Sequence, residues 1–146
     1  MQRELITFEV NSQIFALDIM DVREIRAWSP VTRLPHVPPY IAGVVNLRGT
    51  VLAVIDLAAR LGWEPTSATS RHAIIVVQNG EHSGGLIVDS VSDIVTIPAD
   101  SLQPVPSTTG DSIAPFLEGL TAIDDRMVMV IDLAALAPSS HQAQAA

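Results

Sequence analysis

A six-residue segment occurs twice in this 146-residue chain, and it constrains the fold more than any other feature. Residues 54–59 read Val-Ile-Asp-Leu-Ala-Ala, and residues 130–135 repeat them without change. In each copy an apolar strand pattern meets an aspartate, which favours the N-cap position, and a short helical pattern follows. Strand and turn signals surround both copies in the same order, so we expect two copies of one small β-rich unit.

Turn residues separate short apolar runs throughout the chain, as in hairpins. This pattern predicts about five short strands in each half of the chain, with helix only at the connections, which is typical of small barrels. One such helix is expected after Asp21, because Val22 and Ile25 fall three residues apart and Glu24 lies between them. The side chains of a small barrel fill its interior, so function is expected on the outer faces and in the groove between the halves.

The best linker is the polar segment from Trp63 to Ser70, which contains Pro65. It divides the chain into a first subdomain at residues 11–66 and a second at residues 67–137. Residues 4–10 could pack with the second subdomain. Residues 138–146 are polar and rich in alanine, and we expect a flexible tail there.

The charge balance and the residue types exclude several classes of function. Sixteen acidic and eight basic residues give a net charge of −8, which disfavours binding to nucleic acid and to anionic membranes. The chain has no cysteine, so disulfides, thiolate catalysis and cysteine metal sites are excluded. No apolar stretch is long enough to span a membrane, and the N-terminus has no signal-peptide pattern, so we expect a cytoplasmic protein without membrane insertion.

Asp56 and Asp132 occupy matching positions and invite a catalytic interpretation. Two halves that each supply one aspartate could form an aspartic hydrolase site. However, Leu-Ala-Ala follows both residues, whereas such a site uses Thr/Ser-Gly, and a helix N-cap explains both aspartates. The four histidines are not spaced like metal ligands, so no metal or cofactor is predicted.

The pair Glu24 and Arg48 is a candidate for recognition. Both side chains could lie near one surface if the first half closes as a barrel. They could equally be two independently solvated charges, or Arg48 could be a fixed recognition group at a hairpin tip. Isolated apolar residues are core by default, although some could line the groove between the halves; these residues are Val22, Ile25, Val91 and Ile94.

Several motifs in order and spacing make the chain resemble the CheW family of chemotaxis adaptors, from about Glu4 to Leu136. The strongest is Asn46-Leu47-Arg48-Gly49. The others are Phe8–Val10, Ala16–Ile19, Val22–Ile25, Val31–Arg33, Gly43-Val44, Asp56-Leu57 and Leu86–Asp93.

The resemblance implies a fold, a function and a set of site residues. The fold would be all-β, with two five-stranded SH3-like barrels about a pseudo-twofold axis and short connecting helices. The function would be non-catalytic coupling of methyl-accepting chemoreceptors, through their cytoplasmic tip, to the regulatory domain of the histidine kinase CheA. Residues that match receptor-coupling positions are Val22, Glu24, Arg48, Gly43, Gly49 and Gly85. The expected kinase-contact residues are Val31, Arg33, Leu34 and Ile41.

The same resemblance implies a place in the cell and leaves the pathway open. An adaptor of this kind would be cytoplasmic and held at the inner membrane through receptor arrays. A chemosensory pathway that does not control motility is the alternative, and the hydrolase using Asp56 and Asp132 is the alternative of another class.

Overall fold

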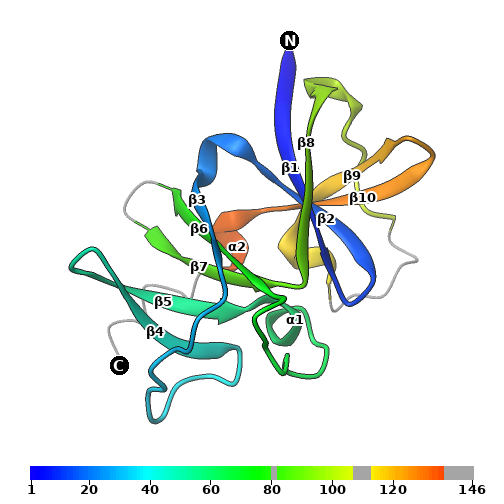
Figure 1. Cartoon of the computed structure of the whole chain (residues 1–146). Coiled ribbons are helices and arrows are strands. Elements are labelled where there is room, and N and C mark those ends of the chain that lie inside the picture. Colours follow the sequence, from blue (N-terminus) through cyan, green and yellow to red (C-terminus); the bar gives the residue numbers. More distant parts are fainter. Residues whose placement is uncertain (80–81, 107–112, 137–146) are drawn as a thin grey trace.

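The computed structural model describes residues 1–79, 82–106 and 113–136, which form two five-stranded sheets (Figure 1). The predicted tail at 138–146 lies outside the described residues. The strands are β1 (Gln2–Val10), β2 (Gln13–Asp18), β3 (Val22–Ala27), β4 (Ile41–Leu47), β5 (Thr50–Asp56), β6 (Ala73–Asn79), β7 (His82–Val88), β8 (Ser90–Pro98), β9 (Leu117–Ile123) and β10 (Arg126–Ile131). The helices are α1 (Leu57–Arg60), α2 (Leu133–Leu136) and the single 3₁₀ turns η1 (Ile19–Asp21), η2 (Ala99–Ser101) and η3 (Ala114–Phe116).

The two sheets have the same internal order but are built from different parts of the chain. One sheet, the inserted barrel, runs β3-β6-β7-β5-β4 and occupies residues 22–88. The other, the flanking barrel, runs β8-β1-β2-β10-β9 and takes its strands from both sides of that segment. Each strand of one barrel thus has a counterpart in the other, which confirms the predicted duplication.

The subdomain boundaries predicted from the sequence are wrong. The strand β2 belongs to the flanking barrel, because it pairs in parallel with β10, and β6 and β7 belong to the inserted barrel, because β7 pairs in parallel with β5. The first hairpin of each copy therefore joins the last strands of the other copy. A sequence repeat does not reveal this exchange, since it says nothing about which copy supplies the partner strand. The pairing of β1 with β8 agrees with the expectation for residues 4–10.

A single β-bridge closes each barrel. Thr32 and Val44 exchange two backbone hydrogen bonds of 2.9 and 2.8 Å, and Gln103 and Leu120 do the same in the flanking barrel. The segment from Val31 to Leu34 contributes only this bridge to the sheet. Two prolines near it, Pro30 and Pro35, cannot donate backbone hydrogen bonds, so a longer ladder is not available.

The largest core lies between the barrels, and a smaller one fills each barrel. In β6, Ile74 and Val76 point into the inserted barrel, while Ile75 and Val77 face the flanking barrel. Both faces of such a strand are buried, which explains why the sequence of β6 is a continuous apolar run rather than an alternating one. The buried residues of the core between the barrels are Ile6, Phe8, Val10, Phe15, Leu17, Ile55, Leu57, Ala58, Leu61, Ile75, Val77, Leu86, Val88, Ile131, Leu133 and Leu136.

Arg60 of the first copy contacts residues of both copies. Its guanidinium carbon lies 4.2 Å from the ring centre of Tyr40 and 4.7 Å from that of Phe116, which are counterparts in the two copies. Its Nε also donates a 3.2 Å hydrogen bond to the carbonyl oxygen of Leu136, the residue at the equivalent position in the second copy. A cation between two aromatic rings stabilises this junction.

The helix predicted after Asp21 is wrong, because residues 22–27 form the edge strand β3. The helical structure is limited to η1, where the Asp18 side chain accepts a 2.9 Å hydrogen bond from the Met20 amide. A register shift lies between Val22 and Glu24 in the pairing with β6. This β-bulge breaks the period-2 alternation and produces the three-residue spacing that resembled a helix.

Candidate functional site

Glu24 and Arg48 form an ion pair across the open seam of the inserted barrel. Glu24 lies on the edge strand β3, and Arg48 lies at the tip of the β4–β5 hairpin, which forms the opposite edge. The Arg48 guanidinium contacts a Glu24 carboxylate oxygen at 2.5 Å, and Arg26 approaches the other oxygen at 3.8 Å. The pair borders a cleft of about 390 Å³ lined also by Arg23, Leu47, Thr50, Leu52, Val76, Val77, Gln78 and Ser83.

The backbone at Arg48 is strained. Arg48 and Gly49 form a two-residue hairpin loop with φ values of +50° and +88°, and the Asn46 side chain accepts a 2.9 Å hydrogen bond from the Gly49 amide. Gly, Asn and Asp tolerate positive φ, but arginine does not favour it. The local turn chemistry therefore does not explain why arginine occupies position 48.

The counterpart of this cleft in the flanking barrel has the opposite charge character. Asp93 and Asp124 occupy the positions that correspond to Glu24 and Arg48, and they line a smaller cleft of about 110 Å³ together with Glu9 and Arg126. The turn at Asp124-Asp125 also has two positive φ values, of +51° and +64°. Two carboxylates cannot form the ion pair seen at Glu24 and Arg48. The duplicated scaffold thus carries a basic hairpin tip on one barrel alone.

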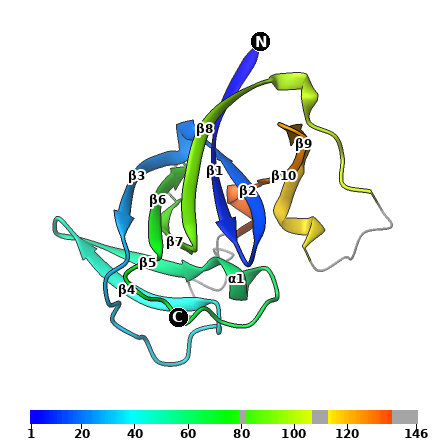
Figure 2. The ribbon, with the colours of Figure 1, turned by 45° about the vertical axis from the view of Figure 1, so that its right-hand side comes forward.

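Ile25 and Ile94 are exposed, so the default assignment of these residues to the core is wrong. Their exposed fractions are 44% and 56%. Each is on an edge strand, opposite Ile75 and Ile6 respectively, and both of these partners belong to the core between the barrels. Ile25 and Ile94 therefore continue the inter-barrel core to the surface along β3 and β8, whose arrangement Figure 2 shows. Val22 and Val91 remain partly buried against that core.

The three glycines predicted as receptor-coupling positions have structural roles. A Cβ atom at Gly43 would lie 2.3 Å from the carbonyl oxygen of Thr32, so glycine allows the closing bridge to form. At Gly85 a Cβ would meet the Ile74 side chain at 2.8 Å. Gly49 has open space around it, and its positive φ in the hairpin turn is what favours glycine there.

A second cleft, of about 660 Å³, contains all four residues predicted to contact the kinase. Val31, Arg33, Leu34 and Ile41 are part of its lining, and Leu34 is 41% exposed. Trp28, Pro30, Val37, Pro38, Pro39, Ala42, Asp56, Pro65, Thr66, Ser67, Ala68 and Ile87 complete the lining. Most of these side chains are apolar, which suits an apolar partner surface.

Asp56 and Asp132 cap their helices, as the sequence predicts, but their surroundings differ. Asp132 is exposed and accepts a 3.2 Å hydrogen bond from the Ala134 amide. Asp56 is only 5% exposed and accepts from the Ala59 amide at 3.4 Å. It also accepts two bonds from Thr66, at 2.6 Å from the amide and 2.8 Å from the hydroxyl. The two carboxylates thus satisfy separate sets of local donors.

No group of three or more metal-ligating side chains occurs within residues 1–79, 82–106 and 113–136. In that same part of the chain, none of the helices is long and apolar enough to cross a membrane.

Two similar barrels, one of which carries two separate clefts, define a class of protein: the β-barrel binding module. The chain belongs to the CheW-like family, because the family model for the CheW-like domain matches residues 4–141. The chain is 52% identical to a probable chemotaxis protein CheW of Rhizobium etli, over 92% of this chain and 86% of that protein. It is 46% identical to the chemotaxis protein CheW of Rhizobium meliloti, over 96% of this chain and 90% of the relative.

A solved structure is also similar. The crystal structure of the scaffolding protein TtCheW from Thermoanaerobacter tengcongensis matches with a TM-score of 0.82 and 34% sequence identity, over 91% of this chain and 86% of that one. Members of the family are non-catalytic adaptors that couple chemoreceptors to the kinase CheA in chemotaxis, and the chain is such an adaptor. The hydrolase interpretation of Asp56 and Asp132 is not supported.

Proposed function

We propose that the inserted barrel holds both partners, the receptor tip at the seam marked by Glu24 and Arg48 and the kinase regulatory domain at the cleft lined by Val31 and Leu34. Among the described residues, the linings of the two clefts have no member in common. A rigid barrel with two separate clefts can hold two partners in one fixed geometry. This separation is the observation that carries the proposal.

The receptor surface combines a charge with apolar contacts. Arg48 is 73% exposed at its side chain, and it is held toward β3 by Glu24. An exposed ion pair contributes only about 0.2–1 kcal/mol to stability, so stability alone is a weak reason for the strained arginine. Ile25 and Ile94 supply exposed apolar side chains on β3 and β8. This combination suits the amphipathic cytoplasmic tip of a methyl-accepting chemoreceptor, a helical hairpin.

Apolar residue types predominate in the lining of the kinase surface. Leu34 lies beside Val31 and Ile41 in the lining of the cleft. Its side chain is partly exposed, so no other element of the described chain covers it completely. We propose that the regulatory domain of a CheA-type kinase docks here barrel against barrel. The assembly would place the chain in receptor arrays at the inner membrane, on the cytoplasmic side.

The test is co-sedimentation of the chain with receptor-containing membranes, with and without the kinase. Arg48→Ala and Glu24→Lys are expected to lose receptor binding and keep kinase binding, whereas Leu34→Asp is expected to do the reverse. Asp124→Ala, at the counterpart of Arg48, is the matched control and should bind both partners normally. If Arg48→Ala and Glu24→Lys leave ternary assembly intact, the receptor surface is assigned wrongly.

A charge swap separates recognition from stability. The double variant Glu24→Arg with Arg48→Glu keeps an ion pair across the seam but reverses its direction. If Arg48 contacts the receptor, the swap is expected to fold and to remain defective. Restored receptor binding in the swap would show that the ion pair only stabilises the barrel and does not contact the receptor.

A further inference from the structure

The segment from Trp63 to Ser70, which the sequence predicts as a linker, is fastened along its length. Its first residue packs edge-on against Phe15 with ring centres 6.1 Å apart, and the Trp63 amide donates a 2.9 Å hydrogen bond to Ala58. Further along, Ala68 packs against the core of the inserted barrel. A segment that merely connected two repeats would not require these contacts.

Asp56 holds the middle of this segment through Thr66. The two hydrogen bonds that Thr66 donates, from its amide at 2.6 Å and its hydroxyl at 2.8 Å, go to the two different oxygens of the Asp56 carboxylate. The carboxylate is nearly inaccessible to solvent. Hydrogen bonds to a buried carboxylate are stronger than neutral ones, and leaving it without them is costly. Within the part of the chain that the structure describes, Asp132 in the identical hexapeptide accepts its hydrogen bond from the Ala134 amide of its own helix.

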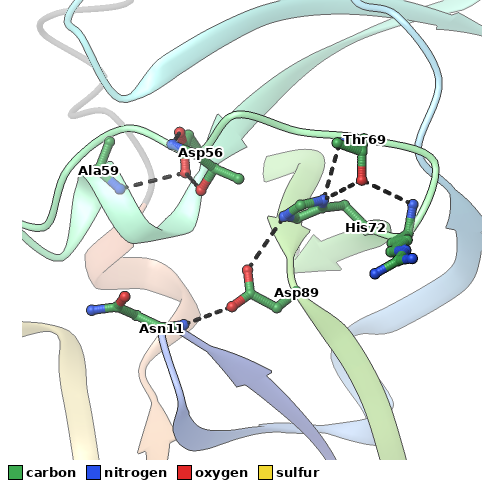
Figure 3. A network of polar contacts seen from close by, with 8 residues as sticks. Asn11, Asp56, Ala59, Thr69, His72 and Asp89 are labelled. Carbon is green, nitrogen blue, oxygen red and sulfur yellow. Dashed lines mark hydrogen bonds and ion pairs between the residues drawn. The ribbon is translucent and has the colours of Figure 1, made fainter.

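The end of the segment is fastened to the flanking barrel (Figure 3). The Thr69 amide donates to Nδ1 of His72 at 3.0 Å, and Nε2 of His72 lies 3.5 Å from a carboxylate oxygen of Asp89. The other oxygen of Asp89 accepts a 2.8 Å hydrogen bond from the Asn11 amide, in the turn between β1 and β2. The segment is therefore fixed at its start, its middle and its end.

Between these attachments the segment forms a wall of the 660 Å³ cleft. Pro65, Thr66, Ser67 and Ala68 line it together with Val31, Arg33 and Leu34, and Ile41, Ala42 and Asp56 also contribute to the lining. In Figure 2 the connection from β3 to β4 and the connection from α1 to β6 lie together at the end of the inserted barrel away from residue 1.

We propose that residues 64–69 are the second wall of the kinase-binding site and that Asp56 and Thr66 are the residues that position this wall. The occupant is an apolar side-chain cluster of the kinase regulatory domain, inserted between the wall and Leu34. The choice of occupant follows from the apolar residues that predominate in the lining, among them Leu34 and Pro65, and from continuity with the surface proposed for the kinase, so it rests on the proposed function. A preformed wall removes the entropic cost of ordering the segment when the kinase binds.

The first test measures affinity for the purified regulatory domain of the cognate CheA-type kinase by calorimetry. Thr66→Val removes the hydroxyl bond to Asp56 and is expected to weaken binding about tenfold, because the wall must then be ordered on binding. Thr66→Ser keeps the hydroxyl and is expected to restore the wild-type affinity. Receptor binding, measured by co-sedimentation, is expected to stay unchanged in both variants.

A second variant does not depend on the buried carboxylate. Ser67 is exposed and lines the cleft, so Ser67→Arg places a bulky charge on the wall without disturbing the fold. It is expected to weaken kinase binding by about tenfold or more, because the charge would lose water at the interface. Asp132→Asn, on the counterpart cap, is the matched control and should bind the kinase normally.

The outcomes separate this proposal from the one it rests on. If Leu34→Asp abolishes kinase binding while Thr66→Val and Ser67→Arg bind normally, the wall has no part in the site and this inference is wrong. If Leu34→Asp also binds normally, the assignment of the whole kinase surface is wrong.

Discussion

Replacing Gly43 with alanine is expected to open the bridge that closes the inserted barrel. The added Cβ would lie 2.3 Å from the carbonyl oxygen of Thr32 and 2.8 Å from its carbonyl carbon, and both are backbone atoms that cannot rotate away. Gly43 also has a φ of +154°, which L-amino acids rarely adopt. The strand β4 and the segment at Thr32 must therefore separate, which weakens the two hydrogen bonds between Thr32 and Val44.

The cost follows from these contacts. Overpacking costs about 1–3 kcal/mol, and each of the two weakened backbone hydrogen bonds adds about 0.5 kcal/mol, so the total is about 2–4 kcal/mol. For a chain of this length, 1 kcal/mol corresponds to roughly 2–4 °C in the melting temperature, so Gly43→Ala is expected to lower it by roughly 4–16 °C. Amide hydrogen exchange at Val44 should accelerate in the folded state.

Thermal unfolding and hydrogen exchange on three variants test this reasoning. Gly119→Ala is the matched control in the flanking barrel, where the added Cβ would lie 2.7 Å from the carbonyl oxygen of Gln103, and it should be destabilised for the same reason. Gly49→Ala meets no atom within 4 Å and strains only its turn, by about 1 kcal/mol. The reasoning is refuted if Gly43→Ala melts like the wild type and loses only receptor binding, because Gly43 would then be a recognition residue.

Three further predictions concern single charged residues. Asp56→Asn is expected to lower the free energy of unfolding by about 1–3 kcal/mol, whereas Asp132→Asn should change it by less than about 0.5 kcal/mol, and urea unfolding of both variants measures the contrast. Burial and neighbouring carboxylates raise the pKa of Asp21, so its charged form is disfavoured in the folded state. Asp21→Asn should therefore stabilise the chain at pH 7, by an amount that declines as the pH falls through the raised pKa and vanishes below the ordinary value of 3.8, and melting curves across this range test it. Arg60→Met is expected to cost about 1–2 kcal/mol by removing the cation between two aromatic rings, and an unchanged melting temperature would contradict that role.

Local features of the fold could be predicted from the sequence because they depend on neighbouring residues. The repeat located both aspartate caps, and the turn signals located the hairpin with Arg48 at its tip. The grouping of strands into barrels could not be predicted in this way. It depends on whether β2 pairs with a strand of its own copy or with β10, and both alternatives bury similar apolar residues.

The candidate site was predicted in part. The pairing of Glu24 with Arg48 was one of two open alternatives, and the structure brings the two side chains into contact. Ile25 was assigned to the core because apolar residues are usually buried. Its exposure follows from its position on an edge strand, and the β-bulge made the sequence of that strand resemble a helix. The role of Thr66 had no signal in the sequence, since a threonine in a polar segment does not reveal a carboxylate partner ten residues away.

The nesting of one barrel inside the other sets the order in which the chain can fold. Every pairing within the inserted barrel joins residues between 22 and 88, so this barrel can form while the rest of the chain is still being synthesised. The β1–β2 hairpin must wait for β8, β9 and β10, and until they arrive Phe8 and Phe15 have no flanking barrel to support them. The β1–β2 hairpin is thus synthesised first but is among the last elements to find its partner strands. A nascent chain stalled beyond residue 88 would expose an apolar surface of the kind that chaperones bind.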